Sequence, residues 1–107
     1  MTVITLPQAV ETFIAATNAH DGDALFAAFA TGATVVDDGT TYATEAELRG
    51  WIKVHQVDPK LVITPTSYDA GRLVASVDGE FPGGPLTFAF TFETKDDVIT
   101  NLSIDVA

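Results

Sequence analysis

Residues 86–93 read Leu-Thr-Phe-Ala-Phe-Thr-Phe-Glu, and this stretch gives the clearest indication of the fold. Large apolar side chains alternate with small or polar ones: Leu86, Phe88, Phe90 and Phe92 on one face, Thr87, Ala89, Thr91 and Glu93 on the other. A period of two is typical of a β-strand with one face in the core. We therefore expect a sheet whose inner face is rich in phenylalanine.

Strand-like runs continue on both sides of this stretch and fill the C-terminal half: about 60–69, 72–81, 86–94 and 97–105. Only short breaks, such as Ala70-Gly71, separate them. Short breaks favour hairpins, and so an antiparallel meander. The last run is the least regular. Its apolar face is expected to carry Val98, Leu102, Ile104 and Val106, with Ile99 and Thr100 disturbing the alternation.

Helical patterns dominate the N-terminal half of the chain. The spacing Thr5-x-x-Gln8 has the form of a capping box, and it predicts a helix over about 7–19. Asp21 then follows as a helix cap. We expect it to open a second, shorter helix with a buried face of Leu25, Phe26 and Phe29.

A strand and a third helix follow before the C-terminal meander. Residues 33–37 are rich in β-branched side chains, and Asp38-Gly39 is a hairpin-turn signal with a short return at 40–42. Thr44-x-x-Glu47 predicts a capped helix on which Glu45 can pair with Arg49. Helices first and strands after predict an α+β fold. About three N-terminal helices should pack on one face of a curved antiparallel sheet, in a single domain over 1–107.

Composition narrows the classes of partner. Fifteen acidic residues against five basic ones give a net charge of −10, which repels nucleic acids and anionic membranes. The chain has no cysteine, and the segment Met1–Pro7 lacks the basic region of a signal peptide, so we expect a cytoplasmic protein. No phosphate-binding glycine motif occurs, and the two histidines lack metal-ligand spacing. The sequence therefore predicts no cofactor and no metal.

Several segments, in this order, carry a resemblance to a known family: 13–25, 29–39, Tyr42, 47–52 and 88–92. They resemble the nuclear transport factor 2-like superfamily, in its SnoaL-like polyketide cyclase and ketosteroid isomerase branch. The resemblance implies a cone-shaped partial barrel with a pocket between helices and sheet, often in a homodimer. It says little about the reaction, because one fold hosts many activities.

Asp37 is the leading candidate for chemistry. It ends the strand 33–37, in which Ala33 and Val35 should face inward, so Asp37 should face inward too. A carboxylate in an apolar pocket can serve as general acid or base. By resemblance, its position matches the base of ketosteroid isomerase. The alternative is that Asp37 only caps the turn at Gly39.

Other parts of the isomerase site are replaced. By resemblance, Phe13 stands where that enzyme has its oxyanion-hole tyrosine, and Phe88 where it has a protonated acid. Neither phenylalanine can donate a hydrogen bond, which argues against steroid isomerase activity. Tyr42 and His55 are weaker candidates for supplying polar groups. The alternative is that Tyr42 reaches solvent and His55 lies at a frayed helix end.

Two functions remain open at this point. Aromatic side chains could wall an apolar ligand pocket, although each could equally be core: Phe13, Phe29, Trp51, Phe88 and Phe90. The first function is a cofactor-free isomerase or cyclase-type enzyme acting on a small apolar carbonyl compound. The second is a non-catalytic ligand-binding or dimerisation domain that pairs through the outer sheet face, Thr87, Ala89, Thr91 and Glu93.

Overall fold

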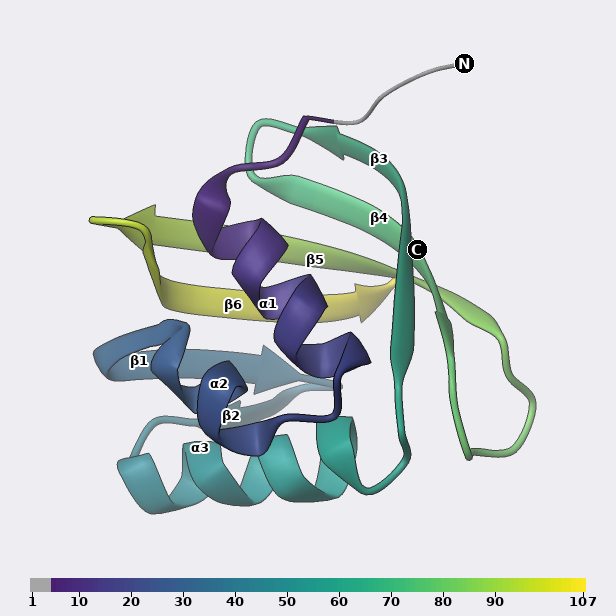
Figure 1. Cartoon of the computed structure of the whole chain (residues 1–107), viewed down its shortest axis with the longest axis horizontal. Coiled ribbons are helices and arrows are strands. Elements are labelled where there is room, and N and C mark those ends of the chain that lie inside the picture. The colour runs from purple at the N-terminus through teal and green to yellow at the C-terminus, as the bar shows by residue number, and fades with distance from the viewer. Residues whose placement is uncertain (1–4) are drawn as a thin grey trace.

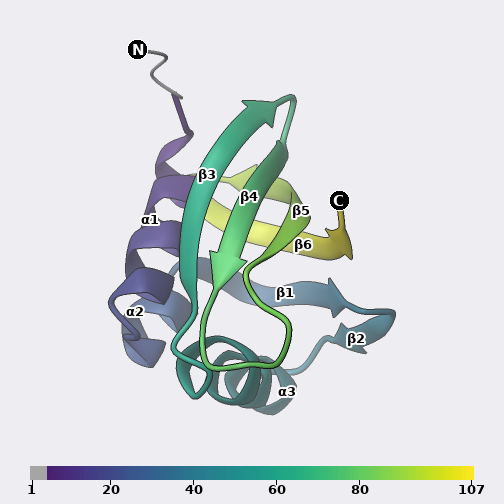
Figure 2. The same cartoon turned by 90° about the vertical axis from the view of Figure 1, so that its right-hand side faces the viewer.

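The computed structural model describes residues 5–107; residues 1–4, part of the segment Met1–Pro7 considered above, lie outside the described residues. Three helices precede the meander, and the third runs on into a π-helical turn. They are α1 (Gln8–Asn18), α2 (Gly22–Ala27), α3 (Glu45–Trp51) and the π-helical turn η1 (Ile52–Val57). Figure 1 shows α1 lying across the sheet, and Figure 2 shows α1 and α2 on one side of it with α3 below. The predicted α+β architecture is therefore confirmed.

Six strands form one curved, unclosed sheet in the order β2-β1-β6-β5-β4-β3. Their bounds are β1 (Phe29–Asp37), β2 (Thr40–Tyr42), β3 (Val62–Asp69), β4 (Arg72–Asp78), β5 (Leu86–Lys95) and β6 (Val98–Val106). Strands β3 to β6 form the expected antiparallel meander. The sheet is mixed, however, because β1 pairs parallel with β6. A pairing between strands so far apart in the sequence leaves no local signal.

Most of the predicted helix caps and turns are present in the structure. The Asp21 carboxylate accepts the Ala24 N–H over 3.0 Å, and Thr44 and Glu47 form the complete capping box of α3. The turn after β1 places Asp38 and Gly39 at φ 51° and 77°, which suits an Asp-Gly hairpin turn. The capping box at Thr5 was wrong: α1 begins after Pro7, and no side chain of the described residues caps it.

Two expected positions shift for reasons of packing. Phe29 is the first residue of β1 rather than part of α2. In β6, Ile99 fills the core and Val98 is only half-buried. The register between β5 and β6 shifts there: Thr94 lies opposite Ile99 while Glu93 lies opposite Asn101, so Thr100 is an extra residue. Such a bulge reverses the facing of the residues that precede it, which explains the irregular alternation.

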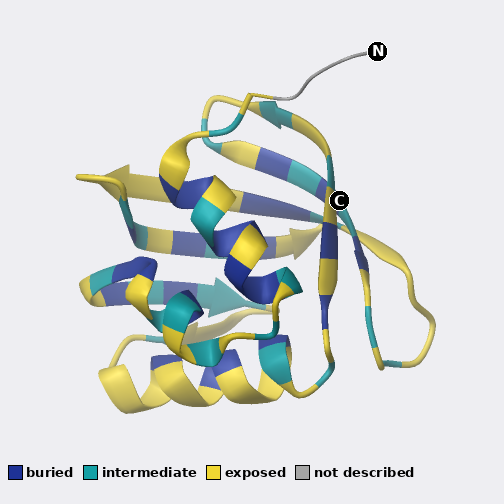
Figure 3. Ribbon diagram, viewed as in Figure 1, coloured by how far each residue is buried: buried dark blue, intermediate teal, exposed yellow. Residues whose placement is uncertain are grey.

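The core lies between α1 and the inner face of the sheet, where buried residues gather on both (Figure 3). Phe13 of α1 is 0% exposed and stands at its centre. Its ring meets those of Phe29, Phe90 and Phe92 edge-on, with centroids 5.4–6.2 Å apart. This aromatic cluster joins α1, β1 and β5. No helix within residues 5–107 is long and apolar enough to cross a membrane.

The capping glutamate of α3 gives stability a pH dependence. The pKa of Glu47 lies below the usual glutamate value because the N–H groups of Ala43 and Thr44, and then the Thr44 side chain, hydrogen-bond the ionised form. A lowered folded-state pKa contributes stability above the unfolded-state pKa, and this is lost as pH falls through the folded one. We therefore expect Glu47→Gln to be less stable than the wild type at pH 7, with the difference disappearing on acidification below pH ~4.

Thermal melts of both proteins from pH 7 to pH 3 measure this difference. Glu45→Gln is the matched control, because this substitution removes the same charge from the same helical turn. Glu45 does not belong to the capping box. If Glu47→Gln and Glu45→Gln follow the same pH course, the capping bonds do not carry the effect.

Candidate functional site

A cavity of about 220 Å³ opens between the inner face of the sheet, the turn η1 and the loop that joins β4 to β5. Its walls are largely apolar and include Leu61, Val77, Phe81, Phe88, Phe90 and Ile104. Three polar side chains also line it: Asp37 from the end of β1, and His55 and Gln56 from η1. An apolar hollow with a few polar groups is what small-molecule sites usually look like.

Asp37 takes its place in this cavity because of where β1 ends. Val35, two residues earlier on the same strand face, is fully buried, and Asp37 is half-buried opposite Ile104 of β6. The indole Nε1–H of Trp51 donates to Asp37 Oδ2 over 2.9 Å. The carboxylate is thus oriented by α3, while the adjacent turn is built by Asp38 and Gly39 with their positive φ angles.

Tyr42 and His55 stand together at the mouth of the cavity. The Tyr42 hydroxyl and His55 Nε2 are 3.5 Å apart, and the Tyr42 ring also lies beside Trp51, with centroids 6.3 Å apart. A wider groove of about 400 Å³ passes over them and shares Asp37, His55, Phe88 and Ile104 with the cavity. His55 belongs to the hydrogen-bonded turn η1 rather than to a frayed end.

The five expected pocket aromatics separate into two groups. Phe88 and Phe90 line the cavity. Phe13, Phe29 and Trp51 are buried and do not line it. For Phe13 the reason is that α1 crosses the middle of the sheet, whereas the cavity lies at the sheet end where β1 stops. Trp51 reaches the site only through its N–H.

Sequence reasoning missed Gln56 and Phe81. Neighbouring residues of an α-helix point about 100° apart, so a helical pattern that selects His55 rejects Gln56. The backbone between Lys53 and Leu61 departs from the α pattern. The Asp58 N–H donates to the Lys53 carbonyl at 2.8 Å, five residues back. Phe81 lies in a Gly- and Pro-rich loop that reads as a plain break between strands.

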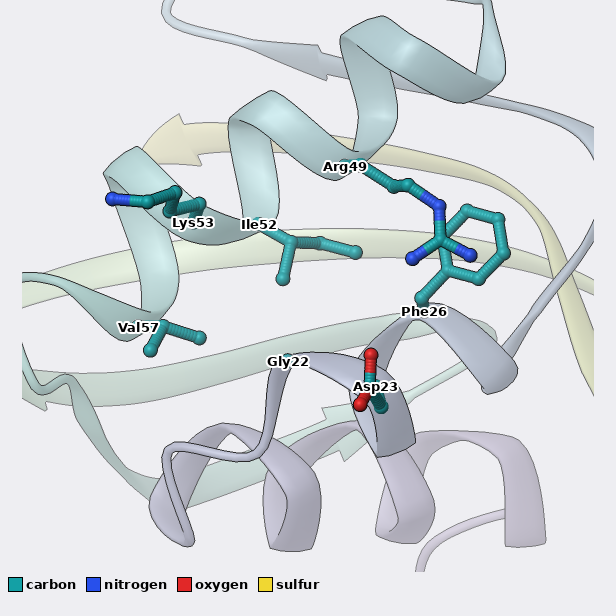
Figure 4. A pocket seen from close by; sticks show the side chains of 7 residues that line it. All are labelled: Gly22, Asp23, Phe26, Arg49, Ile52, Lys53 and Val57. Atoms are coloured by element: carbon teal, nitrogen blue, oxygen red, sulfur yellow. The ribbon is translucent and has the colours of Figure 1, made fainter.

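A second hollow, of about 180 Å³, lies on the outer side between α2 and α3–η1 (Figure 4). Its two cations are engaged: the Arg49 guanidinium stacks on the Phe26 ring at 3.8 Å, and Lys53 pairs with Asp58 at 2.9 Å. Within the described chain Arg49 therefore does not form the expected pair with Glu45, because the Phe26 ring offers a closer partner. Both cations of this hollow are thus engaged by other side chains, and its remaining charged residue is Asp23.

The fold and the cavity together define a small α+β pocket protein, and comparison with known proteins gives its family. Solved structures match along almost the whole chain. A protein of Sinorhizobium meliloti assigned as a polyketide cyclase is 31% identical, with a TM-score of 0.82, over 94% of this chain and 95% of its own. A protein with a ketosteroid isomerase-like fold from Catenulispora acidiphila, solved in complex with trimethylamine, is 26% identical, with a TM-score of 0.79, over 96% and 88%.

A nuclear transport factor 2-like protein of unknown function from Cytophaga hutchinsonii has the same fold, with a TM-score of 0.73 at 15% identity over 99% of this chain and 93% of its own. No protein-family profile matches the sequence, and no curated protein is similar enough to count as a relative. The chain belongs to the nuclear transport factor 2-like superfamily, in its SnoaL-like polyketide cyclase and ketosteroid isomerase branch.

Proposed function

We propose that the cavity binds a small apolar carbonyl compound and that Asp37 moves a proton next to its carbonyl, in an isomerase or cyclase-type reaction. The observation that carries the proposal is the Asp37 carboxylate, which borders an apolar cavity and is oriented by the Trp51 N–H at 2.9 Å. The similarity to cyclase- and isomerase-like proteins supports the same class of chemistry.

The proposed step uses the two carboxylate oxygens differently. Oδ2 accepts the Trp51 N–H, which fixes the carboxylate plane, and Oδ1 takes the proton. The C–H bond next to the substrate carbonyl breaks, its electron pair passes into the carbonyl, and an enolate forms. In an isomerisation the substrate carries a C=C bond next to the deprotonated carbon, the same proton returns to the far carbon of that bond, and the double bond shifts into conjugation as the carbonyl re-forms. In a cyclisation the enolate carbon bonds to a second carbonyl carbon of the same molecule, the π pair of that C=O moves to its oxygen, and this oxygen takes the proton from Asp37.

The developing negative charge on the enolate oxygen needs a hydrogen-bond donor. Phe13 and Phe88 cannot donate, and Phe13 is in the core. His55 lines the cavity and contacts the Tyr42 hydroxyl, so this pair is the proposed source of the donor at the cavity mouth. A neutral imidazole N–H can donate a hydrogen bond to such an oxygen.

Cavity size favours a substrate of one or two rings. An engineered cavity of 150 Å³ in another protein holds one benzene molecule, and pockets for drug-sized ligands begin near ~300 Å³. At about 220 Å³ the cavity lies between these limits. A four-ring steroid exceeds this cavity and would have to extend into the adjoining groove.

Hydrogen exchange next to a carbonyl tests the proposed chemistry without knowledge of the natural product. The protein is incubated in D2O with cyclohexanone, and loss of the proton signals beside the carbonyl is followed by NMR. Exchange well above that of buffer containing a matched concentration of an unrelated acidic protein is the expected result. Exchange at the buffer rate, with binding still observed, would favour the second candidate function, which is binding without turnover. Phe13 and Phe88, which cannot donate, are the observation that favours that candidate.

We also propose that the chain forms a homodimer through the outer face of the sheet. Short side chains meet at its centre, where Thr91 lies opposite Ser103 and Val74 lies opposite Ala89, with the charged Arg72 and Asp105 beside them. A sheet face of short side chains can approach a second copy closely across a two-fold axis. The apolar Val62, which pairs with Asp78 on the same face, is 44% exposed.

Thr91→Arg is expected to convert the dimer to a monomer, because Thr91 is exposed at the middle of this face and an arginine would meet its own copy across the axis. Analytical ultracentrifugation of both proteins at the same concentration measures the change. Gln8→Arg, on exposed α1 surface away from the sheet face, is the control. A wild type that sediments as a monomer up to ~100 μM would contradict the dimer. A dissociation constant weaker than this corresponds to a binding free energy of only about 5 kcal/mol or less.

A further inference from the structure

The Gln56 side chain has an unsatisfied polar atom. The residue is 3% exposed, and its Oε1 is fully buried without a hydrogen-bond partner in the part of the chain that the structure describes. Leaving a buried acceptor without a donor destabilises a fold, so such atoms are rare and call for an explanation. Thr17 Oγ1 is the other such atom of residues 5–107, but of the two residues it is Gln56 that borders the cavity beside Asp37.

The backbone around Gln56 shows the same local irregularity. Gln56 lies in the π-helical turn η1, and its own carbonyl accepts the Leu61 N–H from five residues ahead, at 3.3 Å. π-Helical turns are rare and occur frequently at functional sites. Here the turn lets two successive side chains, His55 and Gln56, border one cavity. The terminal torsion of a glutamine is soft, so its carboxamide can turn toward a molecule bound beside it.

We infer that Gln56 determines specificity by accepting a hydrogen bond from the ligand through Oε1, and that the ligand therefore carries a hydroxyl or N–H donor on its one- or two-ring apolar body. This inference rests on the proposed function for the site. If the site carries out the proposed acid/base reaction, its substrate class is a small carbonyl compound that also carries such a hydroxyl or N–H donor. The donor would meet Gln56, the apolar body would pack against Phe88 and Phe90, and the reacting carbon would lie beside Asp37.

Three probes of similar shape separate the possibilities: phenol offers a hydroxyl donor, anisole only an acceptor, and toluene neither. Their dissociation constants are measured by NMR titration of the full chain. We expect phenol to bind about tenfold more tightly than anisole or toluene, the worth of one buried hydrogen bond. In Gln56→Met, which keeps the length of the side chain without its oxygen, the three probes should bind alike. Gln56→Leu serves as a second variant if the first is poorly folded.

Melting temperature is the independent readout. If the Gln56 side chain stabilises the fold, Gln56→Met should have a lower melting temperature than the wild type. If Gln56 instead serves to bind a ligand, its oxygen is unsatisfied in the free protein. Gln56→Met should then have the melting temperature of the wild type or one a few degrees higher. Asp37→Asn is the control for the acceptor, and it should retain the preference for phenol. If the preference disappears in Asp37→Asn and persists in Gln56→Met, the carboxylate is the acceptor and the inference is wrong.

The remaining outcomes of the binding experiment also test the inference. Anisole binding as well as phenol would mean that the amide donates rather than accepts, which overturns the inference. Failure of the wild type to bind any probe would overturn both the inference and ligand binding in this cavity. Because phenol has no proton next to a carbonyl, its binding is read without catalysis. A protein that prefers phenol but leaves cyclohexanone unexchanged would keep this inference and lose only the catalytic proposal.

Discussion

Asp37→Asn is expected to lower protein-catalysed hydrogen exchange next to the carbonyl of cyclohexanone by about 10²–10⁴-fold, the usual contribution of a general base. The physical reason is that a carboxamide cannot take up a proton near neutral pH. Its oxygen can still accept the Trp51 N–H that now meets Asp37 Oδ2 at 2.9 Å. The substitution should therefore remove the base while leaving its surroundings in place. NMR in D2O measures the rate, and a thermal melt shows that the variant is folded.

Asp96→Asn is the matched control for this experiment. Asp96 lies in the exposed turn between β5 and β6, with a φ of 53° that asparagine also tolerates. That turn is at the opposite end of the sheet, since Asp37 pairs with Ile104 near the end of β6 rather than with its start. The control changes net charge by the same amount and should exchange at the wild-type rate. Equal rates in wild type and Asp37→Asn would remove Asp37 from the mechanism.

Phe13→Ala is expected to cost about 3–5 kcal/mol of the free energy of unfolding, the range for truncating a buried phenylalanine. Phe13 is 0% exposed, and its ring makes edge-on contacts with three other phenylalanines from β1 and β5. Small domains are stable by about 5–15 kcal/mol in total, so this variant should be partly unfolded at body temperature. Urea unfolding followed by the fluorescence of Trp51, the one tryptophan, measures the loss.

Phe88→Ala provides the comparison, because Phe88 is half-buried and borders the existing cavity. Phe88→Ala should lose less than about half as much free energy of unfolding as Phe13→Ala, because the cost of truncating a side chain depends on the packing that is lost. The two variants thus separate a core phenylalanine from a cavity phenylalanine. Similar losses for both would place Phe88 in the core and would contradict an open cavity beside it.

Local features of this fold could be predicted from the sequence because a few neighbouring residues encode each of them. The Asp21 cap needs only the N–H of Ala24, and the Thr44 capping box needs only Glu47. The strand 86–93 follows from its own alternation. One prediction failed where a competing contact decided, because Arg49 stacks on the Phe26 ring rather than pairing with Glu45; the capping box at Thr5 failed because Pro7 is the N-cap of α1 and makes no side-chain hydrogen bond.

The candidate site was only partly predictable for the same reason. Alternation along residues 33–37 indicated that Asp37 faces inward, and the structure places it at the cavity. Helical spacing grouped Trp51 with His55, but only the folded chain joins Trp51 Nε1 to Asp37 Oδ2. Gln56 had no signal, since it depends on a π-helical turn and on a cavity closed by Phe81 from a distant loop.

By itself the sequence determined the acidic charge, the meander, two capped helices and a carboxylate at the end of a strand. Hydrogen bonds and hydrophobic periods over a few residues are sufficient for these features. Only the tertiary structure decided the parallel pairing of β1 with β6, the bulge at Thr100, and which aromatics border the cavity. These depend on packing between segments that meet only when the chain folds, because a side chain becomes core or cavity wall according to what lies opposite it.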